Sequence, residues 1–439
     1  MTPPVRTPLR GLGMAAALLL GLTACGSGGE SSADDVQAAL EEGGKITVWA
    51  WEPTLKQVVK DFEAKHEGVD VELVNAGTGP DQYSALQNAI KAGSGVPDVA
   101  QIEYFALSQF AVAESVADLS SFGAADLDGT FSTGPWNSVN LSGGVYGVPM
   151  DSGPMALFYN KDIFDEHGIE VPTTWEEYVE AGRRLQEADS DVYITNDTGE
   201  PGLATSLIWQ AGGKPYRVDG TDVTVDFTDE GSTAYAQTWQ QLIDEDLVAP
   251  INSWTDEWFQ AMADGTIATI PAGAWMPANL ESSVAEGSGS WRAAPLPQWE
   301  EGASASAENG GSSLTVPEAS QNKALAYAFI EYATVGEGVD TRLDNGAFPA
   351  TNKHLESEEF LSREFEYFGG QQANKVFSES ASNVVEGWSY LPYQVYANSI
   401  FNDTVGKAYV SDTTLAEGLQ AWQEQSVEYG NQQGFSVNK

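Results

Sequence analysis

The chain has 439 residues, with 64 acidic against 20 basic side chains and a formal net charge of −44 at pH 7. A surface this acidic repels nucleic acid phosphates and anionic lipid heads, so neither is expected as a partner. With 42% hydrophobic residues the chain can bury sizeable cores, and its length favours more than one domain.

The N-terminus has the pattern of a secretory signal. Two arginines precede an apolar run over 12–22, which is too short for a permanent membrane span. Leu-Thr-Ala-Cys at 22–25 follows and resembles the bacterial lipobox, whose cysteine becomes the lipidated first residue. We expect residues 1–24 to be a signal peptide and Cys25, the only cysteine, to anchor the chain to the membrane. The alternative is an ordinary signal peptide with a chance cysteine.

The segment 25–44 is predicted to be the lipidated N-terminus and a flexible tether, with at most a frayed helical turn at 36–40, because it starts rich in Gly, Ser and acids and shows no strand pattern. The folded part is expected to begin at Lys45. From there strands alternate with helices, which favours a parallel sheet with helices on both faces. The predicted elements are a strand at 46–51, a helix with its apolar face over 55–62, a strand at 69–73, a helix at 83–92 and a strand at 96–102.

Ligands of such sheets bind beyond the carboxyl ends of the strands. Trp51-Glu52 and Glu103-Tyr104 each follow directly on a predicted strand, so we expect them at the mouth of a site. Further along, Thr174 and Glu177 form a capping box that opens a helix. The remaining predicted elements are a strand at 146–150, an amphipathic segment at 254–262, a strand at 266–271, a crossover loop at 298–311 and a helical face from 325 to 332.

No motif of an enzyme, metal site or cofactor is found. The three histidines are isolated, and the signatures of zinc proteases, serine hydrolases and nucleotide-binding loops are missing. A glycoside hydrolase needs only two carboxylates, which any chain with 64 acids supplies by chance. We therefore predict a non-enzyme without cofactor or metal, and keep a secreted glycoside hydrolase as an alternative.

Thirteen tryptophans carry more information. A sugar has an apolar face, which suits an aromatic plane, and a rim of hydroxyls, which suits Asp, Glu, Asn and Gln. Several tryptophans lie at predicted strand ends or in loops beside such polar residues, which favours a carbohydrate ligand. These are Trp51, Trp136, Trp209, Trp275 and Trp388.

Six segments together resemble the extracellular solute-binding proteins of ABC transporters, in the carbohydrate-binding, maltose-binding-protein-like branch. They are Lys-Ile-Thr-Val-Trp at 45–49, Gly-Val-Pro-Asp-Val at 95–99, Tyr-Gly-Val-Pro at 146–149 with Leu-Phe-Tyr-Asn-Lys-Asp at 157–162, Pro-Thr-Thr-Trp at 172–175, Gly-Thr-Ile-Ala at 265–268 leading to the tryptophan at 275, and Gly-Gly-Ser-Ser at 310–313. The likeness covers nearly the whole mature chain.

The resemblance implies an α/β fold of two lobes with a hinge, each lobe a mixed or parallel sheet flanked by helices. We expect lobe one at 45–150 and 309–370, and lobe two at 151–308 and 371–439. An oligosaccharide would bind in the cleft and be delivered to an ABC permease, at the extracellular face of the cytoplasmic membrane, by a monomer. A polyamine, peptide or polyol ligand on the same fold is the other alternative.

The expected ligand contacts come from the resemblance, except Trp209, which comes from the aromatic pattern. They are Trp51, Glu52, Glu103, Tyr104, Asp151, Trp209, Trp275, Gly311, Trp388 and Tyr390. Asp98 also lies in a matching segment, but its place at a strand end favours a structural role.

Overall fold

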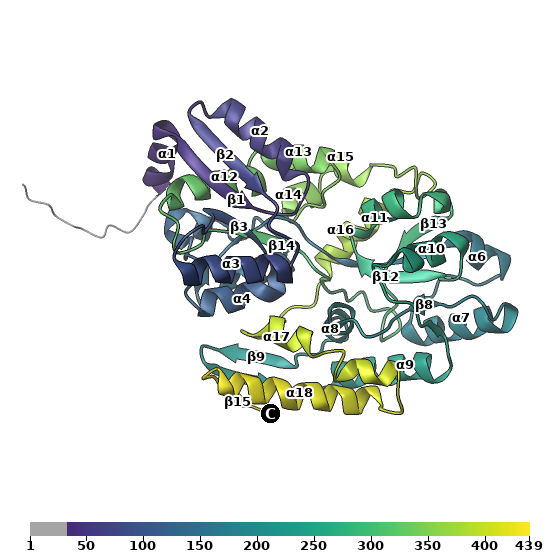
Figure 1. Ribbon diagram of the computed structural model, residues 1–439. Coiled ribbons are helices and arrows are strands. Elements are labelled where there is room, and N and C mark those ends of the chain that lie inside the picture. Colours follow the sequence, from purple (N-terminus) through teal and green to yellow (C-terminus); the bar gives the residue numbers. More distant parts are fainter. Residues whose placement is uncertain (1–32) are drawn as a thin grey trace, which may run out of the picture.

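The computed structural model describes residues 33–439, which form two lobes (Figure 1). The predicted signal peptide and Cys25 lie outside the described residues. In Figure 1 the first lobe lies at the upper left, and the second fills the right and the bottom. None of the helices in the described part of the chain combines the length and the apolar character that crossing a membrane requires.

The sheet of the first lobe has the strand order β2-β1-β3-β14-β6. Its members are β1 (Gly44–Trp49), β2 (Val69–Val74), β3 (Val99–Glu103), β6 (Val148–Pro149) and β14 (Ser312–Thr315). β1 runs parallel to β2 and β3, as the alternating pattern predicts, whereas β14 is antiparallel to both β3 and β6. The sheet is therefore mixed, because the chain returns to it as β14 after building the second lobe.

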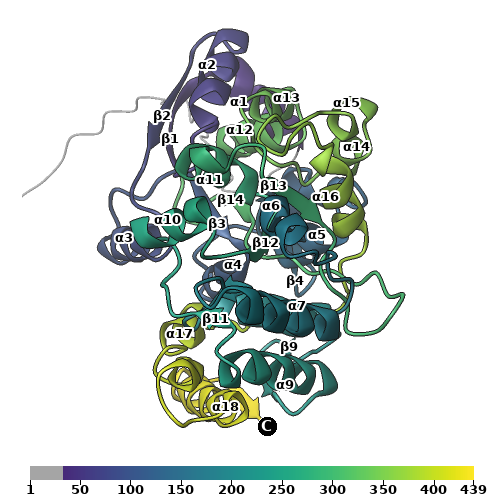
Figure 2. The ribbon, with the colours of Figure 1, turned by 90° about the vertical axis from the view of Figure 1, so that its right-hand side faces the viewer.

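Helices surround this sheet (Figure 1 and Figure 2). They are α2 (Leu55–Lys65), α3 (Pro80–Ala92), α4 (Tyr104–Val112), α5 (Thr133–Val139), α12 (Lys323–Thr334) and α13 (Gly338–Asp344), with short turns η1 (Ser120–Phe122) and η2 (Ala124–Leu127) and a hairpin of β4 (Asn140–Leu141) and β5 (Gly144–Val145). Leu55, Val58, Val59 and Phe62 are the buried face of α2, as their spacing predicts. Asp98 accepts hydrogen bonds from the backbone of Thr47 at 2.9 Å and from the Ser320 hydroxyl at 2.7 Å, a structural role.

A flexible tether is wrong for residues 33–44, where the helical turn expected at 36–40 is part of a complete helix. This stretch forms helix α1 (Ala33–Glu42) and the first residue of β1. Val36 is buried, and Ala39 and Leu40 pack against the first core, so the spacing i, i+3, i+4 gives α1 an apolar face. Because that face is covered by the first lobe, the fold begins about a helix earlier than the Gly- and Ser-rich composition indicates.

The second lobe is centred on the antiparallel sheet β12-β7-β13. Its strands are β7 (Met155–Asn160), β12 (Thr269–Gly273) and β13 (Trp291–Ala294), with smaller pairings of β8 (Thr195–Asn196) with β11 (Val248–Ala249) and of β10 (Asp222–Val225) with β9 (Tyr216–Asp219) and β15 (Ser436–Asn438). Its helices are α6 (Lys161–Glu166), α7 (Trp175–Ala188), α8 (Pro201–Gln210), α9 (Glu230–Asp244), α10 (Asp256–Asp264), α11 (Met276–Ser283), α14 (Asn352–Leu355), α15 (Glu358–Leu361), α16 (Ala373–Ser382), α17 (Gln394–Ser399) and α18 (Leu415–Gln432), with turns η3 (Ala285–Gly287) and η4 (Val405–Tyr409). Thr174 and Glu177 form the predicted capping box of α7.

Leu355 and Phe368 pack with the second lobe, in the cluster that also holds Trp291 and Phe377. The side chains thus pass to a core of the second lobe before residue 370, which is earlier than the end of lobe one predicted from the sequence. The aromatic residues between 355 and 370 need apolar partners, and β13 and α16 supply them.

Two segments join the lobes side by side, and we call them the first crossing (150–154) and the second crossing (308–312). The amide of Met150 donates to the Ser312 carbonyl at 2.9 Å, and the amide of Asn309 donates to the Gly153 carbonyl at 2.8 Å. A Cβ on Gly153 would lie 2.2 Å from the Asn309 carbonyl oxygen, so only glycine permits this approach.

Candidate binding site at the lobe crossings

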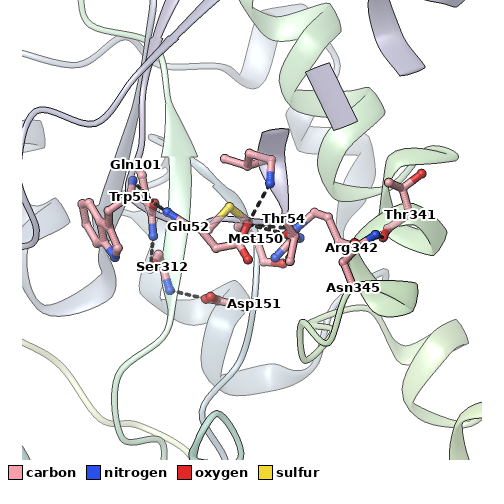
Figure 3. A network of polar contacts seen from close by, with 11 residues as sticks. Trp51, Glu52, Thr54, Gln101, Met150, Asp151, Ser312, Thr341, Arg342 and Asn345 are labelled. Atoms are coloured by element: carbon pink, nitrogen blue, oxygen red, sulfur yellow. Dashed lines mark hydrogen bonds and ion pairs between the residues drawn. The ribbon is translucent and has the colours of Figure 1, made fainter. Parts of the chain in front are cut away.

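Gln101 on β3 connects the loop after β1 to the second crossing (Figure 3). Its side-chain oxygen accepts hydrogen bonds from the amides of Trp51 and Glu52, both at 3.1 Å, and its nitrogen donates to the Ser312 hydroxyl at 3.0 Å. Gln101 is fully buried. It therefore fixes the place of two expected ligand residues, although it lies inside a strand pattern and gave no signal in the sequence.

Tyr104, Asp151 and Gly311 lie together where the crossings leave the first sheet. The Tyr104 hydroxyl donates to the Asp151 carbonyl at 2.6 Å, and the Tyr104 amide donates to the Gly311 carbonyl at 3.1 Å. Gly311 has φ +90°, and a Cβ there would meet the Tyr104 ring at 2.5 Å. The ring is thus packed on glycine backbone, and the amide of Ser312 donates to the Asp151 carboxylate at 2.5 Å.

Glu103 stands at the end of β3 and is half-buried. Its carboxylate accepts the Tyr83 hydroxyl at 2.8 Å, and burial together with the nearby negative charge of Asp151 raises its pKa to about 7. Burial also raises the pKa of Asp151 to about 6, although the positive charge of Arg342 opposes the shift. The site therefore holds carboxyl groups that keep a proton at higher pH than exposed ones do.

Glu308 is a third carboxyl of this kind, and it is not among the residues expected from the sequence. It is 2% exposed, and its carboxylate accepts hydrogen bonds from the Ser152 hydroxyl at 3.0 Å and the Gly153 amide at 2.6 Å. Burial raises its pKa to about 7, and the charge of Asp151 adds to the shift. It lies in the Gly- and Ser-rich stretch expected to be a plain crossover loop, so nothing local distinguished it from 63 other acids.

Arg342 is the cation of this region. Its side chain comes from α13, is 2% exposed and donates through one terminal nitrogen to the Met150 carbonyl at 2.5 Å. Its Nε lies 4.0 Å from the Glu52 carboxylate (Figure 3). The Glu52 carboxylate also accepts from the Leu55 amide at 3.2 Å, at the start of α2. Arg342 thus ties the first crossing to the loop that carries Trp51 and Glu52.

Aromatic rings reach the same region from the second lobe. Trp275 is half-buried, and its indole N–H donates to the Asn309 carbonyl of the second crossing at 2.7 Å. Trp388 stacks on Trp209 with ring centroids 5.1 Å apart and planes 6° from parallel. Trp209 is only 4% exposed and donates to the Val385 carbonyl at 2.6 Å, so it lies behind Trp388.

A cavity of about 400 Å³ lies between the lobes. Helix α4 contributes Tyr104 and Ser108 to its wall, and the segment before α17 contributes Trp388 and Tyr390. Asn137 on α5 adds an amide. Volume and lining, with aromatic rings and a few polar groups, are those of a site for a small molecule. Of the expected contacts, Tyr104, Trp388 and Tyr390 line this cavity, while Trp51, Glu52, Glu103, Asp151, Gly311 and Trp275 gather at the crossings beside it.

Two α/β lobes, joined by paired crossings and lined with aromatic and carboxyl groups where they meet, define a two-lobed solute-binding protein. Known proteins agree with this. The sequence profile described as bacterial extracellular solute-binding protein matches residues 50–338. The chain is 25% identical over 407 residues to a lactose-binding protein of Rhizobium radiobacter, covering 87% of this chain and 92% of that one.

Solved structures are also similar over most of the chain. The binding protein of an ABC transporter from Bifidobacterium animalis subsp. lactis Bl-04, in complex with β-1,6-galactobiose, has 42% identity and a TM-score of 0.81, covering 90% of this chain and all of that one. The galacto-N-biose/lacto-N-biose I-binding protein of Bifidobacterium longum has 26% identity and a TM-score of 0.80, covering 90% and 99%. The chain therefore belongs to the bacterial extracellular solute-binding protein family, and the expected family and fold are confirmed.

Proposed function

We propose that this protein is a receptor that binds an uncharged oligosaccharide between its lobes and delivers it intact to an ABC permease. The observation that carries the proposal is the meeting, at the two crossings, of aromatic planes from both lobes with carboxyl and amide groups. Aromatic planes suit the apolar faces of sugar rings, and the polar groups suit their hydroxyls.

An uncharged ligand fits the electrostatics best. One buried carboxyl (Glu308), two half-buried ones (Glu103 and Asp151) and one buried arginine lie at or beside the crossings, so an anionic ligand would meet net negative charge. Carboxyls whose pKa is raised to about 6 or 7 can accept or donate hydrogen bonds to hydroxyls as they titrate. The relatives support this choice, because lactose, β-1,6-galactobiose and lacto-N-biose, the saccharides in their names, are all uncharged.

The roles of the expected residues follow from where they lie. Trp51, Trp275 and Trp388 offer ring faces, and Glu52, Glu103, Asp151 and Tyr390 offer hydrogen-bonding groups. Tyr104 and Gly311 shape the floor of the site through their mutual packing. We assign Trp209 to the support of Trp388 and not to the ligand itself, since almost none of its surface is exposed.

We further propose that the protein works as a monomer, without cofactor or catalysis, held outside the cell by lipid on Cys25. One relative supports the anchor: a lipoprotein of Streptomyces antibioticus is 28% identical over 200 residues. Replacing Cys25 by serine in the native host should release the protein into the medium. Retention of the Cys25→Ser protein in the membrane fraction would contradict the anchor.

A thermal-shift screen tests the ligand class. The protein is heated with β-1,6-galactobiose, lactose, arabino-oligosaccharides, a polyamine, a peptide mixture and a polyol. A ligand that binds only the folded state raises the melting temperature. The proposal expects a rise with one of the saccharides and none with the other three classes. A rise with the polyamine or the peptides alone would keep the fold and replace the ligand.

A further inference from the structure

Trp254 differs from every other tryptophan of the chain. All thirteen lie within residues 33–439, and twelve are buried or half-buried, whereas Trp254 is 52% exposed. Its backbone has φ +66°, a left-handed conformation that is unfavourable for a bulky side chain. The ring packs on Trp258 and Phe259, with centroids 5.2 Å and 6.5 Å away, yet half of its surface stays exposed. Packing therefore accounts for only part of this placement on a costly backbone, which is typical of a functional position.

Asn196 holds the loop that carries Trp254 through hydrogen bonds. The Asn196 amide nitrogen donates to the Ile251 carbonyl at 3.0 Å and to the Ser253 hydroxyl at 2.9 Å. The Asn196 oxygen accepts the indole N–H of Trp258 at 2.7 Å. One buried side chain thus uses its donors on the loop and its acceptor on helix α10, which follows the loop.

A second set of hydrogen bonds holds Asn252, which lies two residues before Trp254 in the same loop. The Thr198 hydroxyl donates to the Asn252 side chain at 2.8 Å, and the Thr255 hydroxyl donates to the Asn252 carbonyl, also at 2.8 Å. Thr255 in turn caps α10 by accepting from the Trp258 amide at 3.2 Å. The strained residue is therefore held by neighbours on both sides, which is how backbone strain persists at functional positions.

The Trp254 ring continues the aromatic surface of the site. Its centroid lies 5.5 Å from that of Trp275, with the planes 36° apart. Trp275 is bonded to Asn309 of the second crossing, and the positive-φ residue Gly310 lies against its indole ring. The two rings therefore form one aromatic surface, with Trp275 at the crossing and Trp254 on the solvent side.

We propose that Trp254 is an outer stacking position for a sugar ring, one ring further from the crossings than the ring on Trp275. The inference rests on the proposed function and deepens it: the site takes an oligosaccharide longer than the part held at the crossings. The contribution of Trp254 then grows with the length of the saccharide.

Calorimetric titration of the Trp254→Gly variant with β-1,6-galactobiose and β-1,6-galactotriose tests this. Glycine adopts φ +66° without strain, so the variant removes the ring and relieves the backbone together. We expect a melting temperature close to that of the wild type, because relief of the backbone offsets the lost ring contacts with Trp258 and Phe259. The Kd for the trisaccharide should be weaker by about 30-fold, as for an aromatic residue that the ligand covers, and the Kd for the disaccharide should change less than about threefold.

Two control variants separate the ring from the backbone. Trp254→Phe keeps an aromatic plane and should retain most of the affinity for the trisaccharide. Asp246→Gly relieves a comparable strain, φ +54°, in the turn after α9, and should raise the melting temperature with binding unchanged. If Trp254→Gly binds the trisaccharide as tightly as the wild type does, this inference is overturned and the proposed function is not affected. If the wild-type protein binds neither β-1,6-galactoside but binds another saccharide of the thermal-shift screen, the same comparison is made with two lengths of that saccharide. If it binds no saccharide, the proposed function fails and this inference fails with it.

Discussion

Glu308 on the second crossing is bonded to Ser152 on the first: the Ser152 hydroxyl lies 3.0 Å from each oxygen of the Glu308 carboxylate. The amide of Gly153 approaches the same carboxylate at 2.6 Å. Because the acid of one crossing is held by donors of the other, the two segments between the lobes are linked by a side chain as well as by backbone. That side chain is buried, so the link depends on its protonation.

The stability of the protein should fall between pH 5 and pH 8. The pKa of Glu308 is about 7 in the fold against 4.5 for an ordinary glutamate, so in this range the folded state binds more protons than the unfolded state. The free energy of unfolding then decreases with rising pH. Glu103, with a pKa of about 7, and Asp151, with about 6, act in the same direction.

Glu308→Gln should remove the part of this slope that belongs to Glu308. Since glutamine stays uncharged, the unfolding free energy of the variant minus that of the wild type should rise by on the order of 2 kcal/mol from pH 5 to pH 8. Denaturant melts at several pH values measure it. Parallel wild-type and variant profiles would show that Glu308 ionises in the fold at its ordinary pKa.

Gly311→Ala should strongly destabilise the protein. The new Cβ would lie 2.5 Å from the Tyr104 ring, and the backbone at φ +90° disfavours any residue except glycine. We expect a loss of about 2 kcal/mol or more in unfolding free energy, with weaker saccharide binding because the floor of the site moves. Tyr104→Phe is the milder companion, costing about 1 kcal/mol through the lost hydrogen bond to the Asp151 carbonyl. An unfolding free energy of Gly311→Ala equal to that of the wild type would contradict the packing of Tyr104 on Gly311.

Variants of Trp388 and Trp209 should differ in effect: the first should mainly weaken saccharide binding, and the second should mainly lower stability. Trp388→Ala removes a ring face that lines the interlobe cavity, so saccharide affinity should drop about tenfold or more. Trp209→Phe keeps a plane behind Trp388 and loses the hydrogen bond to the Val385 carbonyl, so it should lower the melting temperature and change affinity less. The reverse ranking of the two affinities would give Trp209 the ligand contact.

Asp98→Ala should lower stability and leave binding alone. Asp98 precedes β3 and accepts from the Thr47 amide and the Ser320 hydroxyl, at the opposite end of this strand from Glu103 and Tyr104. Unpairing these two donors should cost about 1–3 kcal/mol. Melting curves and a saccharide titration on one preparation are sufficient. An affinity change that persists well below the melting temperature would assign Asp98 to the site.

The early strands and helices could be predicted because their apolar spacing is local. The α2 face, the cap at Thr174 and the strand-end position of Trp51 all follow from residues within one turn or one strand. Only a frayed turn of helix α1 could be predicted in the same way, because its short apolar face is stable only when packed on α12 and the first core.

The network that fixes the site was not predictable, since its members are far apart in the chain. Gln101 lies 211 residues from Ser312, and Arg342 lies 192 from Met150. Glu308 is one of 64 acids, and only burial and the donors of the other crossing distinguish it. Trp254 was visible as the first residue of an amphipathic segment, but its exposure and positive φ are properties of the folded loop.

Isothermal titration calorimetry of the unlipidated chain from residue 26 with β-1,6-galactobiose, followed by mass spectrometry of the recovered sugar, tests the central claim most directly. The account predicts saturable binding at one site per monomer, with the disaccharide recovered intact after prolonged incubation. Cleavage of the sugar at catalytic protein concentration would make the protein a glycoside hydrolase. Absence of heat with this and every other uncharged saccharide would contradict the receptor.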